Sequence, residues 1–192
     1  MRLFASLAAT AILFGACGGT AAAPSPTPAP STAAPTPTPT PAPTPQLKYV
    51  FTADLKTSNE VPAITDAEAS CAGKGTFTLN TTKDTTGKIT AATAQFDLTV
   101  SGCPTSTMII LFHVHKQVAG QNGGVVVDSG QKATSPIALT TGGTTAPVTM
   151  TNPTVDPALA TDIIANPSGY YFNVHSQLHS GGFIRDQLKL SQ

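Results

Sequence analysis

The chain has 192 residues, and its ten Lys and Arg residues balance ten Asp and Glu residues, so the formal net charge is zero. Nucleic acid is bound mainly through Lys and Arg contacts to phosphates, and without a basic excess no nucleic-acid partner is expected. Charged residues make up only 10% of the chain. Thr and Ser supply the polar surface instead, which suits an all-β exported domain because Thr packs well on a pleated sheet.

Residues 1–17 have the pattern of an export signal. Arg2 supplies a positive charge, and the apolar run over 3–14 is too short to span a bilayer as a mature helix. The segment ends in Gly15-Ala16-Cys17, which resembles the lipobox of bacterial lipoproteins. The resemblance implies lipidation of Cys17 and a protein anchored to a bacterial membrane, either the outer membrane or the cell surface. An ordinary secretory signal is the alternative.

Residues 18–46 form a low-complexity segment in which proline alternates with Thr, Ser and Ala. Proline fixes φ and removes backbone donors, so the segment is predicted to be a disordered Pro/Thr-rich linker of polyproline II character. At about 3.1 Å per residue it could hold a domain up to roughly 70–90 Å from a membrane.

Residues 47–192 are predicted to form one globular domain. Strands are predicted, in chain order, over 49–55, 75–80, 89–100, 108–114, 125–128, 146–150, 170–175 and 183–190. One short helix is expected over 158–165, between the strands at 146–150 and 170–175, with Asp156 as its N-cap and Pro157 at its first position. Short strands with frequent turns predict an all-β Greek-key β-sandwich, either immunoglobulin-like or superoxide-dismutase-like.

The histidines are the main candidates for chemistry, because all four fall in two short segments. They are His113, His115, His175 and His179. The first two are two residues apart on a predicted strand, so their side chains should share one face. If the second segment lies beside that strand, four imidazoles converge on a site suited to copper or zinc. A structural cluster of hydrogen-bonded histidines is the alternative.

Cys71 and Cys103 remain once Cys17 is assigned to the signal. An even pair of cysteines in an exported domain indicates one disulfide, and two buried free thiols are the alternative. Neither cysteine neighbours a histidine in sequence, so a cysteine ligand to the metal is not expected.

An ordered series of motifs gives the chain a family resemblance. The series is Asn59-Glu60-Val61-Pro62, Ser101-Gly102-Cys103, His113-Val114-His115, Gly-Gln-Asn-Gly-Gly over 120–124, Gly-Tyr-Tyr-Phe-Asn-Val-His over 169–175 and Gly-Gly-Phe-Ile-Arg over 181–185. It resembles the CHRD domain, named after chordin and found in many bacterial exported proteins, over residues 50–190. The closing motif departs from the family pattern at Phe183 and Asp186. The resemblance implies an extracytoplasmic β-sandwich module and gives no reaction.

Glu60 and Arg185 are the two charged residues in these family motifs. The resemblance leads us to expect an ion pair that ties the first loop to the last strand, which would be costly to break if it is buried. A catalytic carboxylate at Glu60 is the alternative.

Phe112-His113-Val114-His115 is also similar to the copper strand of copper–zinc superoxide dismutases. The loop after His115 lacks the additional histidines and the aspartate that hold zinc in those enzymes. The favoured hypothesis is therefore a non-enzymatic, membrane-tethered binding or structural module with a candidate copper or zinc site and, by analogy with chordin, a secreted or cell-surface protein partner. A copper-dependent redox enzyme of the superoxide dismutase type is the second hypothesis.

Overall fold

The computed structural model describes residues 46–140, 143–145 and 147–191. The expected signal, Cys17 and the linker up to residue 45 lie outside the described residues. Within the described part, every helix is too short or too polar to cross a membrane.

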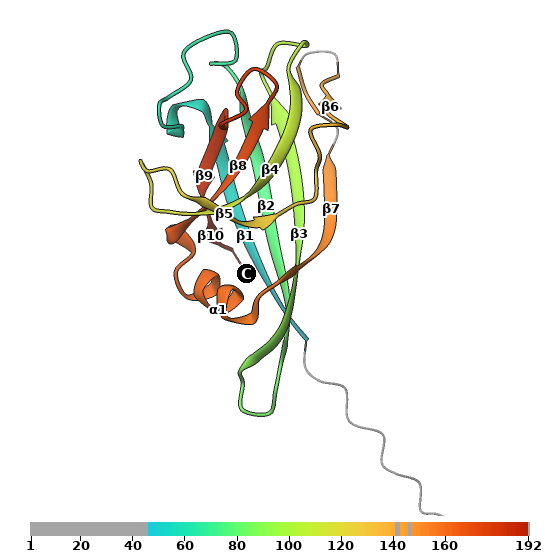
Figure 1. The fold of residues 1–192 in the computed structure, drawn as a ribbon, viewed down its shortest axis with the longest axis vertical. Helices are drawn as coiled ribbons and strands as arrows, with labels where there is room; N and C mark the ends of the chain where they lie inside the picture. Colours follow the sequence, from blue (N-terminus) through green and yellow to red (C-terminus); the bar gives the residue numbers. More distant parts are fainter. Residues whose placement is uncertain (1–45, 141–142, 146, 192) are drawn as a thin grey trace, which may run out of the picture. The chain divides into compact units, whose positions relative to one another are not determined.

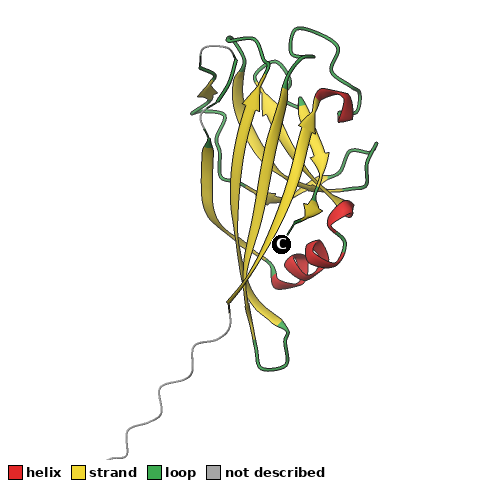
Figure 2. Ribbon diagram, turned by 180° about the vertical axis from the view of Figure 1, so that it is seen from behind, coloured by secondary structure: helices red, strands yellow, loops and turns green. Residues whose placement is uncertain are grey.

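The described residues are mostly β-strand (Figures 1 and 2). The elements are β1 Gln46–Lys56, η1 Thr57–Asn59, β2 Ala72–Lys83, β3 Ile89–Ser101, β4 Met108–Lys116, β5 Gly124–Asp128, β6 Ile137–Ala138, β7 Val148–Val155, α1 Pro157–Ala165, η2 Pro167–Gly169, β8 Tyr170–Ser176, β9 Ile184–Gln187 and β10 Lys189–Leu190. The all-β class with one short α-helix is confirmed. The side chain of Asp156 caps that helix by accepting hydrogen bonds from the amides of Ala158 and Leu159.

The strands join into one antiparallel sheet in the order β5-β4-β8-β9-β1-β2-β3-β7, with β6 on β4 and β10 on β1. The sheet curls until its edge strands β5 and β7 touch, so it is nearly closed. The predicted final strand over 183–190 divides at Leu188, because β9 pairs with β8 while β10 pairs with β1. With one continuous sheet, the division into the two sheets of a Greek-key sandwich stays a prediction.

The core lies inside the curl and is built on a row of phenylalanines. The ring of Phe77 lies 5.9 Å from that of Phe51 and 5.1 Å from that of Phe96. Phe96 in turn lies 6.0 Å from Phe112 and 5.6 Å from Phe172. Phe51, Phe77 and Phe96 lie on β1, β2 and β3, whereas Phe112 and Phe172 lie on β4 and β8. These contacts therefore pack the two halves of the sheet against each other.

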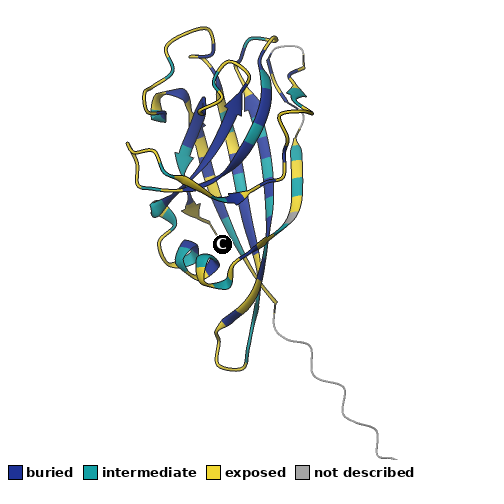
Figure 3. Ribbon diagram, in the orientation of Figure 1, coloured by how far each residue is buried: buried dark blue, intermediate teal, exposed yellow. Residues whose placement is uncertain are grey.

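Strand β8 differs from β3 in its burial (Figure 3). Buried and partly exposed residues alternate along most of β3, as expected for a strand with one face toward solvent. All seven residues of β8 are buried. Tyr170, Phe172 and Val174 belong to the core, so the alternate residues Tyr171, Asn173 and His175 lie on the opposite, outer face. That outer face is covered by loops, and it carries the candidate site.

A disulfide joins Cys71, which precedes β2, to Cys103, which follows β3, across a sequence separation of 32. We expect the Cys71→Ser, Cys103→Ser double variant to lose about 4 kcal/mol of unfolding free energy, because the unfolded chain regains the entropy of an open loop. Urea unfolding measures this difference. Equal stability of the variant and the oxidised parent would contradict the prediction.

Candidate metal centre

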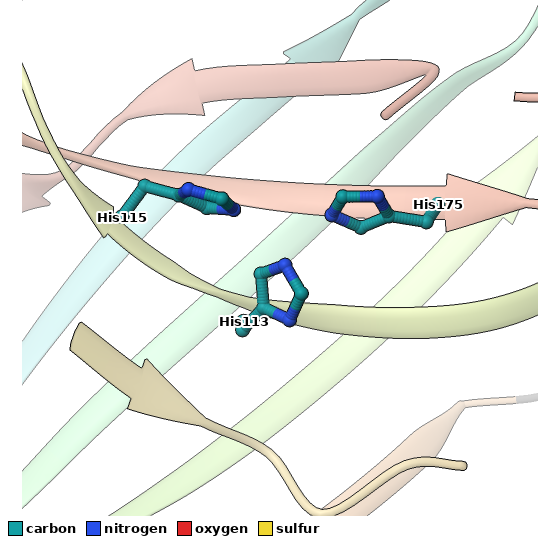
Figure 4. Close-up of side chains that lie close together, drawn as sticks. All are labelled: His113, His115 and His175. Atoms are coloured by element: carbon teal, nitrogen blue, oxygen red, sulfur yellow. The ribbon is translucent and has the colours of Figure 1, made fainter. Parts of the chain in front are cut away.

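Three of the four histidines meet on the covered outer face (Figure 4). His113 and His115 project from β4 and His175 from β8, and one ligand nitrogen from each lies within 4.8 Å of the others. The ring centroid of His113 is 4.6 Å from that of His115 and 4.4 Å from that of His175. All three side chains are buried. The pairing of β4 with β8 brings them together, because Leu111 lies opposite His175 and His115 lies opposite Tyr171.

His179 lies outside this cluster, contrary to the expected convergence of four imidazoles. Its Nε2 atom is 3.0 Å from Asp66 Oδ2 and 3.9 Å from Glu68 Oε2. The loop after β8 turns back on itself, and the amide of His179 donates to Ser176 Oγ. Ser176 Oγ also donates to Glu68 Oε2. His179 therefore fastens the loop after β8 to the loop before β2, and the two acidic partners had no recognisable motif in the sequence.

Backbone carbonyls fix two of the imidazoles in one tautomer. His115 Nδ1 lies 2.8 Å from the carbonyl oxygen of Gly123, and His175 Nδ1 lies 2.8 Å from that of Ser180. A carbonyl oxygen only accepts, so each Nδ1 must carry the hydrogen and each Nε2 keeps its lone pair. Among the residues that the structure describes, no group hydrogen-bonds to the buried Nε2 atoms of these two residues or of His113. In metal-binding proteins, hydrogen bonds from the other ring nitrogen to a carbonyl, such as those to Gly123 and Ser180, orient the histidine ligands.

Gly123 contacts both His115 and Tyr171 of β8. Its amide donates to the hydroxyl of Tyr171, whose ring stacks on His115 with centroids 4.8 Å apart. A Cβ atom on Gly123 would clash with the backbone carbonyl of Lys116, so the close approach requires glycine. The sequence analysis included the glycine-rich segment over 120–124 among the family motifs but gave no role to Gly123. Gly123 and Ser180 support the imidazoles through main-chain carbonyls, which every residue type has, so the residue types alone do not reveal this role.

Burial lowers the pKa of all three clustered histidines. The pKa of His113 falls to about 3, because burial disfavours its charged form and the other two imidazoles add repulsion. Burial also depresses the pKa of His115 and of His175, although the carbonyls of Gly123 and Ser180 oppose that shift. The three imidazoles are therefore neutral at pH 7, which is the form that binds a metal ion.

Glu60 and Arg185 lie beside the cluster, both almost fully buried. Glu60 Oε2 is 3.7 Å from Arg185 Nε. Arg185 also donates to the carbonyl of Asn59 and to Asn122 Oδ1, both at 2.7 Å, and its guanidinium lies over the ring of Tyr171. Burial raises the pKa of Glu60 to about 7 despite the opposing effect of Arg185. This pair ties the loop after β1 to β9.

These shifts give the metal-free protein a defined pH dependence. We expect its unfolding free energy to fall as the pH drops from 6.5 to 4.5, the ordinary pKa values of the imidazole and of Glu60. In this range unfolding lets His113, His115 and His175 take up protons, while Glu60 releases the one it holds when folded. The imidazoles outnumber Glu60, so unfolding takes up protons and acid favours the unfolded state. Urea unfolding at successive pH values measures the slope, and a stability that stays level or rises toward pH 4.5 would contradict it.

Comparison with known proteins supports the family resemblance and adds no solved relative. The family model of the CHRD domain matches residues 51–188. No curated protein and no solved structure matches the chain. The similarity to copper–zinc superoxide dismutases therefore stays a prediction. The match begins within β1, continues through β9 and includes the three clustered histidines. On this evidence, the chain belongs to the CHRD domain family.

Proposed function

We propose that this CHRD domain binds one copper or zinc ion through the Nε2 atoms of His113, His115 and His175. Two observations carry the proposal: one ring nitrogen from each of the three buried histidines lies within 4.8 Å of the others, and the Nε2 atom of each has no hydrogen-bond partner among the described residues. Burial of a polar atom without a partner costs free energy, so a purely structural role does not account for three such atoms. A bound ion would satisfy all three at once.

The donor set points to a particular class of ion. Three neutral imidazoles suit copper and zinc, whereas calcium and magnesium prefer oxygen ligands. Both cysteines of the domain are joined to each other, so a thiolate ligand is not expected. A metal site with three protein ligands keeps a position for a further ligand.

We further propose that the domain works outside the cytoplasm as a lipid-anchored module. The support comes from the sequence, where an apolar signal ends at Cys17 and a proline-rich linker follows. The membrane would be reached through lipid on Cys17. A secreted or cell-surface protein is the partner class that the chordin analogy favours.

Metal analysis of the purified protein after incubation with Cu²⁺ or Zn²⁺ tests the proposed centre. We expect about one equivalent to be retained by the parent and lost in the His113→Ala, His175→Ala double variant, because two of three ligands are removed. His179→Ala is the matched control, since His179 pairs with Asp66 and lies outside the cluster. Absence of retained metal in the parent, or equal retention in the double variant, would refute the proposal.

The second hypothesis, a copper-dependent redox enzyme of the superoxide dismutase type, can also be tested, because three protein ligands would leave a position for a further ligand on the ion. Redox chemistry at a copper ion needs such a position for an exogenous ligand. Superoxide dismutation by the copper-loaded parent, lost in the double variant, would favour the enzyme. Copper binding without that activity would favour the binding module.

A further inference from the structure

The three imidazole nitrogens are part of a larger set of unsatisfied buried atoms. Glu60 Oε1, Asn173 Oδ1 and Arg185 Nη2 are also buried, and they have no hydrogen-bond partner within the described part of the chain. Asn173 lies directly opposite His113 in the pairing of β4 with β8 and directly opposite Arg185 in the pairing of β8 with β9. Directly paired residues share a face of the sheet. Asn173 therefore stands between the imidazoles and the Glu60–Arg185 pair.

The loop after β8 places Gly182 close to both Asn173 and Glu60. A Cβ atom on Gly182 would lie 2.6 Å from Asn173 Nδ2 and 3.0 Å from Glu60 Oε1. The amide of Asn173 and the carboxyl of Glu60 are therefore neighbours around Gly182. Gly182 has φ +122°, a conformation that also favours glycine. One side chain separates Glu60 from the metal-binding face.

Charge makes this proximity important. The three imidazoles are neutral, and Arg185 is a buried cation beside them. A divalent ion would add two positive charges to the same region, and buried charge without compensation is costly. Two groups from other elements face Glu60, namely the guanidinium of Arg185 from β9 and the imidazole of His179 from the loop after β8. Asp186 and Glu60 line the same pocket. The carboxylate of Asp186 already has partners, because its Oδ2 accepts hydrogen bonds from Lys189 Nζ and from the amide of Asp54.

We propose that Glu60 is the charge-compensating residue of the metal centre, and that it favours divalent ions by releasing its proton when such an ion binds. The inference rests on the proposed function. The proton leaves as H⁺ to solvent through a pocket of about 250 Å³ that is lined by Glu60, Gly120 and Arg185. Glu60 is then an anion that offsets part of the added charge, while a monovalent ion such as Cu⁺ has less need of it.

Burial supports this role, because it keeps Glu60 partly protonated at pH 7 in the metal-free protein. A nearby divalent cation favours the ionised carboxylate and lowers that pKa. Binding of the ion and loss of the proton are therefore coupled, and each promotes the other.

The test compares Zn²⁺ with Cu⁺ in the full-length protein and in its Glu60→Gln variant, which keeps the side-chain shape and removes the charge. Competition with chelators gives both affinities, and titration in weak buffer at pH 7 gives the protons released per ion. We expect the variant to bind Zn²⁺ about 10- to 100-fold more weakly and to release fewer protons. Its affinity for Cu⁺ should change by less than about threefold. Asp186→Asn is the matched control, because it removes a carboxylate from the same pocket and should leave both affinities unchanged.

The outcomes separate this inference from the metal site itself. Parent-like Zn²⁺ affinity and proton release in Glu60→Gln would overturn the role of Glu60 and leave the metal site standing. Equal losses of Zn²⁺ and Cu⁺ affinity would also overturn it, because Glu60 would then serve only the fold. Glu60→Asp keeps the charge and should retain the preference for Zn²⁺. A parent that binds neither ion would refute the proposed function, and the inference with it.

Discussion

Replacing Arg185 with methionine should lower the unfolding free energy by about 3–5 kcal/mol, the loss typical of breaking a buried ion pair by removing one partner. The guanidinium donates to the carbonyl of Asn59 and to Asn122 Oδ1, and it lies over the ring of Tyr171. Methionine fills much of the same volume, but it donates no hydrogen bond to either acceptor and leaves the buried carboxyl of Glu60 without its cationic partner. The carboxyl of Glu60 can take up a proton, which keeps the loss within this range. Urea unfolding at pH 7 measures the change.

Lys189→Met is the matched control for that measurement. Lys189 follows β9 and pairs with Asp186 at 2.7 Å, but more than half of its side chain is exposed. Exposed pairs typically contribute about 0–1 kcal/mol, so this variant should stay within about 1 kcal/mol of the parent. Equal losses of unfolding free energy in the two variants would show that burial does not increase the contribution of the Arg185 pair to stability.

Replacing Gly123 with alanine should weaken binding of Zn²⁺ or Cu²⁺ by about 10- to 100-fold, the usual effect of losing a hydrogen bond that orients a metal-binding histidine. The new Cβ atom would clash with the carbonyl of Lys116, so the turn must move. The movement takes the Gly123 carbonyl away from His115 Nδ1 and the amide away from the hydroxyl of Tyr171. His115 then loses both its fixed tautomer and its fixed ring position. Chelator competition measures the affinity.

Gly124→Ala is the matched control for the turn, because a Cβ atom on Gly124 would meet no atom within 4 Å. This variant changes the same turn by the same chemical group and should bind metal as the parent does. Parent-like affinity in the Gly123→Ala variant would mean that the carbonyl is dispensable for positioning His115. That result would leave the metal-binding proposal standing, but it would refute the proposed role of the turn in orienting His115.

Local patterns in the sequence predicted most of the strands, although not β6, and placed two of the three clustered histidines on one face. Phe96 and Leu98 alternate with polar neighbours, so β3 could be recognised without knowledge of its partners. His113 and His115 are two residues apart in a run of strand-forming residues, and this spacing alone places them on one face. The capped helix was visible for the same reason, because Asp156 and Pro157 act on the residues next to them.

Long-range pairing determined the features that the sequence could not predict. Continuity of the sheet depends on contacts such as Lys56 with Arg185, which lie more than a hundred residues apart in the chain. His175 joins the cluster because β8 pairs with β4. His179 is turned away from it by Asp66 and Glu68, two carboxylates from an earlier loop. His175 lies within β8 and His179 in the loop after it, but no motif in the sequence identified Asp66 and Glu68 as the partners of His179.

The pairing of β1 with both β9 and β10 has a consequence for how the protein is made. On one side β1 pairs with β2, but its neighbours on the other side are β9 and β10, near the end of the domain, so the sheet cannot close until residues up to Leu190 are present. Such late, non-local contacts slow folding, because the entropy of a long loop is lost before they form. Ser180 and Arg185 also come late in the chain. A chain that stops before β8 would therefore present His113 and His115 without His175 and without the ring of Tyr171. We expect tight metal capture to begin only after β8 and the loop that follows it have been made.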